Sequence, residues 1–228
     1  MTPNLRGIPY TAKNLQLFSK DLEPLNVSYK MMPDYLINDG QCIRVHYDKG
    51  SVITGANLKG QFQLVQFHFH WGSKSGIGSE HLINGKCADA ELHLVHLNTK
   101  YNDVFEAMEQ DDGLAVLGVF LRESSSEAPN ALKPITEKFA NLTNFGHQYK
   151  CTEPFDLTKM LPDLTEFVTY DGSLTTPPLK QVQILLQSRF INRYPFLLAF
   201  LVKRNFKPIK KVTIYRSPLY KYSHNEME

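Results

Sequence analysis

Two histidines separated by one residue are the most informative chemical feature of this chain. His68 and His70 lie in the run QFHFHWG at 66–72, in which aromatic residues alternate with polar ones. Such alternation predicts a β-strand, and residues i and i+2 of a strand point to the same face. Both imidazoles should therefore project side by side, as two ligands of a metal ion would.

A second predicted strand, AELHLVH, offers a third imidazole. Alternation puts Glu91 and His93 on one face and His96 on the other. His93 is the better third ligand, because Glu91 could hold the proton on its second ring nitrogen. Gln66 stands in the same relation to His68. Three neutral imidazoles suit zinc, which in catalytic sites leaves its fourth tetrahedral position to water.

Other interpretations of these histidines remain open at this level. An HxH pair in a strand is also typical of two ordinary half-buried histidines. It also opens the iron site of cupins, but that site needs a glutamate shortly after the pair, where this chain has SKSG. Nothing in the sequence pairs His46 with a metal, and His81 is expected to be structural. We expect His96 to be buried and hydrogen-bonded rather than bound to metal.

Six segments in a fixed order carry a family resemblance. They are QFHFHWG at 66–72, SEH at 79–81, AELHLVH at 90–96, NTKY at 98–101, DGLAVLGVFL at 112–121 and GSLTTPPL at 172–179. Together they resemble the α-class carbonic anhydrases, and the similarity runs from about Leu22 to Leu179. The resemblance implies a mostly β (α+β) single domain, with a large, twisted, mainly antiparallel sheet and small peripheral helices. Helices are expected at 104–110 and 130–142.

The resemblance also implies a metal centre and its supporting residues. Zinc would be bound by Nε2 of His68, Nε2 of His70 and Nδ1 of His93. Gln66 and Glu91 fall on the positions of the residues that support these ligands.

Further roles follow from the same resemblance. Thr175 would accept a hydrogen bond from zinc-bound hydroxide and donate its own proton to Glu80, and these two are the expected catalytic residues. The expected substrate-binding residues are Thr176, Val95, Val116 and Leu174, of which the last three would form an apolar wall for carbon dioxide.

The implied activity is that of a zinc lyase, which hydrates carbon dioxide reversibly to bicarbonate and a proton. Family members with high turnover carry a proton-shuttle histidine where this chain has Gln41, after Asn38-Asp39-Gly40. Glutamine cannot titrate, so reduced activity is expected. The alternative is a catalytically impaired or non-catalytic relative that acts as a binding module. Such relatives have usually lost a zinc histidine, whereas His68, His70 and His93 are all present, which favours the enzyme.

The resemblance weakens toward both ends of the chain. We divide it into a carbonic anhydrase-like domain at 1–188, incomplete relative to the family, and an atypical basic segment at 189–228. The segment carries nine lysines and arginines against two acidic residues. Trp71 is the only tryptophan, so the family's pocket tryptophan is absent, and Leu185 is expected near its place.

Composition sets the frame for these predictions. With 228 residues, of which 42% are hydrophobic and 21% charged, the chain fits one ordinary globular domain. A net charge of +2 demands no nucleic-acid partner. The expected partners are the small molecules carbon dioxide and bicarbonate, and the chain is expected to be a monomer. The three cysteines are too few and too irregularly spaced for a disulfide framework.

The sequence also bears on location. No leader-like apolar stretch follows Met1, so a cytoplasmic location is expected. The longest apolar run, at 195–202, has eight residues, whereas a membrane-spanning helix needs about 20. No contact with a membrane is therefore predicted.

Overall fold

The computed structural model describes residues 22–82, 86–123, 132–176, 179–187 and 191–194. The structure describes only the backbone of residues 191–194. The rest of the basic segment at 189–228 lies outside the described residues. The strands are β1 (Asn26–Ser28), β2 (Tyr35–Asn38), β3 (Ile43–His46), β4 (Val52–Thr54), β5 (Phe62–Trp71), β6 (Ala90–Asn98), β7 (Leu114–Glu123), β8 (Gln148–Lys150), β9 (Phe167–Ser173), β10 (Gln181–Gln187) and β11 (Ile191–Tyr194).

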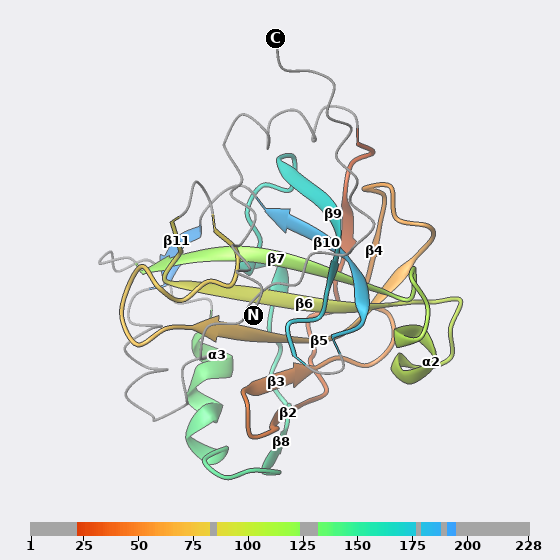
Figure 1. Cartoon of the computed structure of the whole chain (residues 1–228). Helices are drawn as coiled ribbons and strands as arrows, with labels where there is room; N and C mark the ends of the chain where they lie inside the picture. Colours follow the sequence, from red (N-terminus) through yellow and green to blue (C-terminus); the bar gives the residue numbers. More distant parts are fainter. Residues whose placement is uncertain (1–21, 83–85, 124–131, 177–178, 188–190, 195–228) are drawn as a thin grey trace, which may run out of the picture.

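One 11-stranded sheet organises the described chain. Its strand order is β8-β2-β3-β5-β6-β7-β10-β9, with β4 joining β1 to β5 and β11 pairing with β7. The long strands β5, β6 and β7 cross the middle of the molecule side by side (Figure 1). Neighbours are antiparallel except where β10 and β11 pair with β7. The predicted mostly β, mainly antiparallel single domain is confirmed.

Both faces of the central strands are buried, because the side chains of β6 alternate between two apolar clusters. Leu92 and Leu94 belong to the larger cluster, together with Phe67 of β5. Val95 belongs to the smaller one, together with Val116 of β7. Since the two clusters lie on opposite faces, the alternation expected for β6 places His93 on the face of the smaller cluster.

A bulge in β5 sets which face carries the histidines. The β5–β6 pairing shifts between the pairs Leu64–His96 and Gln66–Val95, which leaves Val65 as an extra residue. Before the bulge, Leu64 faces the larger apolar cluster; after it, Phe67 does. Without this shift of phase, the face of Leu64 would continue through the two β5 histidines.

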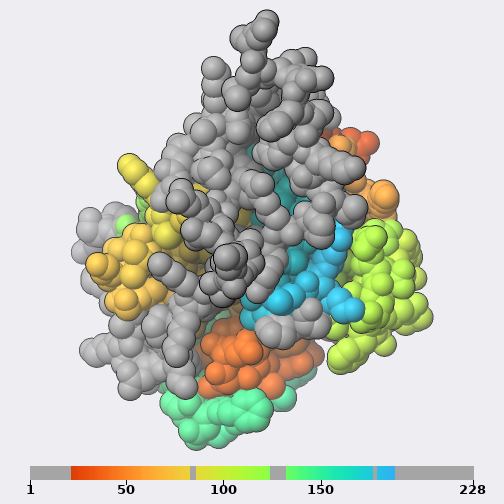
Figure 2. All heavy atoms as spheres, viewed as in Figure 1, coloured from red at the N-terminus to blue at the C-terminus, as the bar shows by residue number. Residues whose placement is uncertain are grey.

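The helices are short and lie at the periphery. The helix expected at 104–110 is α2 (Val104–Met108), whose first turn is capped by Asp103 accepting from the backbone of Glu106. It forms one flank of the molecule (Figure 1, Figure 2). The helix expected at 130–142 is divided into α3 (Lys133–Thr136) and the 3₁₀ helix η1 (Glu137–Asn141), and its first two residues lie outside the described part. A second 3₁₀ helix, η2, spans Leu157–Met160.

Within the described ranges, no helix is both long enough and apolar enough to cross a bilayer.

Phe67 tests how far the sheet depends on its larger cluster. Its ring is fully buried and packs against Tyr47, Phe69 and Phe155. Phe67→Ala should lower the free energy of unfolding by about 3–5 kcal/mol, because the cavity cannot close. Phe105→Ala is the matched control, since that ring is 79% exposed, and should change it by less than about 0.5 kcal/mol. Urea denaturation measures both, and equal losses would contradict this account of the core.

Candidate metal centre

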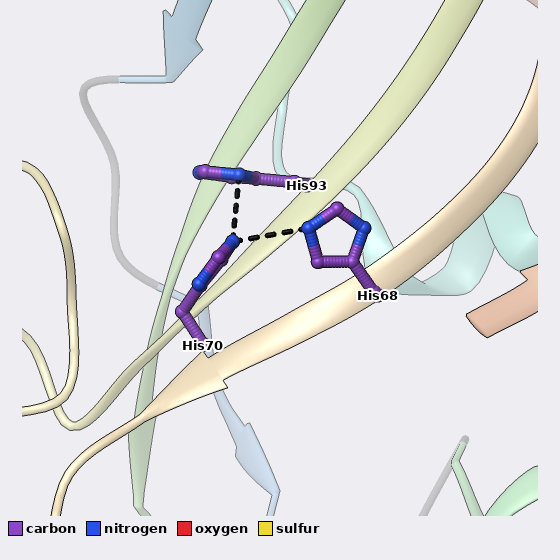
Figure 3. Close-up of side chains that lie close together, drawn as sticks. All are labelled: His68, His70 and His93. Carbon is purple, nitrogen blue, oxygen red and sulfur yellow. Dashed lines mark hydrogen bonds between the residues drawn. The ribbon is translucent and has the colours of Figure 1, made fainter. Parts of the chain in front are cut away.

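The three histidines predicted as ligands converge on one point. His68 and His70 come from β5, and His93 stands opposite His68 on β6. The Nε2 atoms of His68 and His70 are 3.1 Å apart, and Nε2 of His70 is 2.9 Å from Nδ1 of His93 (Figure 3). All three side chains are buried, with 3–9% of their surface exposed.

The outer ring nitrogens determine which nitrogens face the shared point. Gln66 Oε1 lies 2.9 Å from Nδ1 of His68, and Glu91 Oε1 lies 2.7 Å from Nε2 of His93. Each of these oxygens accepts a ring N–H, which leaves a lone pair on the opposite nitrogen. Nε2 of His68 and Nδ1 of His93 therefore both present lone pairs to the point they share with His70.

This donor set fits zinc. Lone pairs aimed at one another repel, and a cation between them removes that repulsion. A tetrahedral zinc with Zn–N distances of about 2.0–2.1 Å holds its ligand atoms about 3.3–3.4 Å apart. The spacings of 3.1 and 2.9 Å require the rings to open by only a few tenths of an ångström.

Burial and neighbouring charges act differently on the three rings. Burial, followed by the adjacent histidines, holds the pKa of His68 and of His70 well below the ordinary value, so both rings are neutral. Burial would also lower the pKa of His93, but the Glu91 carboxylate raises it above the ordinary value. At pH values below this raised pKa a proton competes with a metal for Nδ1 of His93, so metal affinity should rise with pH.

Glu91 is the centre of a buried hydrogen-bond network. Its side chain is 0% exposed, and it accepts from both backbone N–H groups of Glu80 and His81, as well as from the His81 and His93 rings. His81 in turn lies 2.5 Å from the Tyr170 hydroxyl. His81, Glu91 and His93 also satisfy the spacing of a metal triad, but hydrogen bonds to Glu91 already account for that arrangement.

Glu80 lies beside the same centre. Its side chain is 4% exposed, and Oε1 is 3.3 Å from Nδ1 of His70. Burial raises the pKa of Glu80, while the Thr175 hydroxyl and His93 act in the opposite direction. Neither carboxylate oxygen has a fully formed hydrogen bond to a described residue, and neither has Nδ1 of His70. Glu80 is therefore near two groups that could donate to it, His70 and Thr175.

A cavity of about 280 Å³ opens next to the histidines. The predicted site residues that line it are Gln66, His68, His93, Val95, Val116, Leu174, Thr175 and Thr176. Gln41 is exposed and is not among its lining residues. Leu185 was expected near the missing tryptophan, and that expectation is wrong. Alternation along β10 turns Ile184 into the cavity and buries Leu185 in the larger cluster on the opposite face.

Two residues, Tyr170 and Arg44, gain importance only from the structure. Tyr170 completes the network through His81, which the sequence indicated merely as structural. Arg44 lines the cavity beside His68. The alternation in β3, with Ile43 and Val45 buried in the core, could have placed Arg44 on the site face, but only the β3–β5 pairing brings it to the histidines.

Comparison with known proteins identifies the family of this chain. The sequence profile of the eukaryotic-type carbonic anhydrase family matches residues 11–187. Carbonic anhydrase 7 of Homo sapiens is 42% identical over 172 residues, and that of Mus musculus is 40% identical over the same length. Each alignment covers 72% of this chain, which spans 63% of the length of those relatives. The chain belongs to the eukaryotic-type carbonic anhydrase family.

His93 and His96 form a matched pair for testing the ligand set. Both are buried on β6, but His96 faces the other way and its Nε2 lies 2.8 Å from the Tyr29 hydroxyl. His93→Ala should abolish stoichiometric zinc binding, because one of three protein ligands is lost. His96→Ala should lower the thermal midpoint and keep the zinc. Zinc content by atomic absorption checks both, and a His93→Ala protein that retains zinc would exclude this centre.

Proposed function

We propose that this protein is a zinc enzyme that hydrates carbon dioxide reversibly to bicarbonate and a proton. The observation that carries the proposal is the convergence of three neutral-donor histidine nitrogens beside a cavity that is largely apolar. His68, His70 and His93 would hold the ion. When bound there, zinc would lower the pKa of a coordinated water from about 15.7 to about 7 and so supply hydroxide at neutral pH.

Neutral ligands matter for this chemistry. Gln66 and Glu91 orient His68 and His93 without contacting the shared point themselves. An ion bound by three uncharged imidazoles keeps its full charge, which is what acidifies water. Ligand orientation by buried acceptors also raises metal affinity.

Thr175 and Glu80 would fix the orientation of the hydroxide that attacks carbon dioxide. Burial raises the pKa of Glu80, and the nearby Thr175 hydroxyl, which would donate to that carboxylate, acts to lower it. The hydroxyl oxygen is then left as an acceptor toward the cavity, where it can take a hydrogen bond only from a group that still carries a proton. This arrangement would hold the attacking oxygen with a lone pair toward the substrate.

The apolar wall would hold the substrate. Val95 and Val116 are buried in the smaller apolar cluster and line the cavity with Leu174. Carbon dioxide is uncharged and apolar, so it gains from displacing water there without needing hydrogen-bond donors. Thr176 lines the same cavity, where its hydroxyl would contact bicarbonate.

The alternative of a non-catalytic binding module is not favoured, because the complete histidine set and the cavity occur together. The monomeric state and the cytoplasmic location expected from the sequence stay predictions.

Substitutions of Thr175 and of Glu91 should have different effects, the first on the hydration rate and the second on zinc affinity. Thr175→Ala should keep zinc and lower the rate of carbon dioxide hydration by about 10²-fold, because one oriented polar group is lost. Glu91→Gln should lower the affinity for zinc by about 10- to 100-fold. Stopped-flow hydration and chelator competition measure the two effects. Thr165→Ala, at an exposed position, is the control and should change neither. A wild-type protein that binds zinc without hydrating carbon dioxide would refute the proposed function.

Gln41 should limit the rate at which the proton leaves. With no titratable shuttle, a donor of pKa about 7 releases its proton to water at about 10³ per second, given a reverse encounter rate near 10¹⁰ M⁻¹s⁻¹. Gln41→His should raise kcat, because the pKa of histidine, about 6.5, matches the donor. Concentrated imidazole buffer should do the same for the unmodified protein. A kcat unchanged by either treatment would show that proton release is not limiting.

A further inference from the structure

Arg44 introduces a permanent charge into a cavity that is otherwise neutral or apolar. Among the described residues that line this cavity, it is the only arginine, and no lysine, aspartate or glutamate accompanies it. β3 pairs with β5 at Val45 and Phe67, and Arg44, the residue before Val45, lines the cavity together with His68. The side chain is 26% exposed, so its charge is only partly screened by water.

An ion pair with Asp39 holds the Arg44 guanidinium in position. Its Nε donates to Oδ2 of Asp39, and it is the only guanidinium nitrogen that donates a hydrogen bond to a described residue. Asp39 in turn accepts from the backbone N–H groups of Gln41 at 2.9 Å and Cys42 at 2.8 Å. These bonds fix the carboxylate in its loop. Asp39 itself does not line the cavity, whereas Arg44 does, so the ion pair through Nε leaves the other guanidinium nitrogens available to a ligand in the cavity.

Arg44 lines the same cavity as His68 and His93 of the histidine centre. Hydroxyl-bearing residues, among them Ser173, Thr175 and Thr176, line the same cavity. A planar oxyanion there could meet the Arg44 guanidinium and these hydroxyl groups together.

We propose that Arg44 forms a subsite for a small oxyanion on the wall of this cavity, and that bicarbonate or another planar carboxylate is its ligand. Arginine suits such an anion, because its N–H groups match the two oxygens of a carboxylate. The choice of bicarbonate rests on the proposed function, whereas the anion site itself does not. The subsite would strengthen the binding of bicarbonate, which is charged, and leave the binding of uncharged carbon dioxide unchanged.

Acetate is a direct probe of the subsite. Calorimetric titration of sodium acetate into the full-length, zinc-loaded chain at constant ionic strength should give a dissociation constant that rises about tenfold in Arg44→Gln, because a charged hydrogen-bond donor is lost. Arg44→Lys should fall between the two, because it keeps the charge and loses the fork. Arg122→Gln is the control, since this arginine is exposed at the end of β7. Inorganic phosphate, which is tetrahedral, should be affected less than acetate.

Kinetics supply a second, independent readout. In Arg44→Gln, KM for bicarbonate in the dehydration direction should rise, while KM for carbon dioxide stays unchanged. Acetate affinity that is equal in the wild type and Arg44→Gln would overturn the proposal. Equal weakening in Arg44→Gln and Arg122→Gln would also overturn it, because the effect would then be one of overall charge. A chain that hydrates no carbon dioxide but shows Arg44-dependent acetate binding would refute the enzyme and keep the subsite.

Discussion

The pairing register of β5 and β6 is the constraint on which the whole site depends. Side chains alternate across a strand, so a slip of one residue would turn every ligand to the opposite face. The apolar residues Leu64 and Phe67 belong to the same cluster although three positions separate them. Only the extra residue Val65 reconciles these spacings, and it brings His68 directly opposite His93. The hydrophobic core therefore sets the geometry of the polar centre.

A second constraint is that the polar groups beneath the histidines must satisfy one another. A fully buried carboxylate such as Glu91 would cost several kcal/mol if left unpaired. Here it accepts from the His81 and His93 rings and from two backbone N–H groups. The network reaches β9 through Tyr170. The orientation of His93 is thus tied to a strand that supplies no ligand.

Sequence periodicity could predict local features, such as strands and the direction of their side chains, but not contacts between segments that are distant in the sequence. The alternation through His68, His70 and His93 gave the strands and the shared face, because side-chain direction in a strand depends only on spacing. The division of the 130–142 helix and the placement of Ile184 instead of Leu185 follow from packing between distant segments. Tyr170 and Arg44 could not be predicted for the same reason, since 89 residues separate Tyr170 from His81 and Arg44 shares the cavity with His68 of another strand.

The sheet has contacts enough that the fold would not depend on a bound metal in the way that small zinc domains do. β5 and β6 are paired at nine register positions, so the two strands that carry all three ligands are already held together by backbone hydrogen bonds. Their outer faces are buried in apolar clusters that extend well beyond the histidines. A bound ion would add a local link between neighbours and close no long loop of chain. The sheet can therefore hold the histidines close to ligand geometry in advance, which lowers the ordering cost of binding.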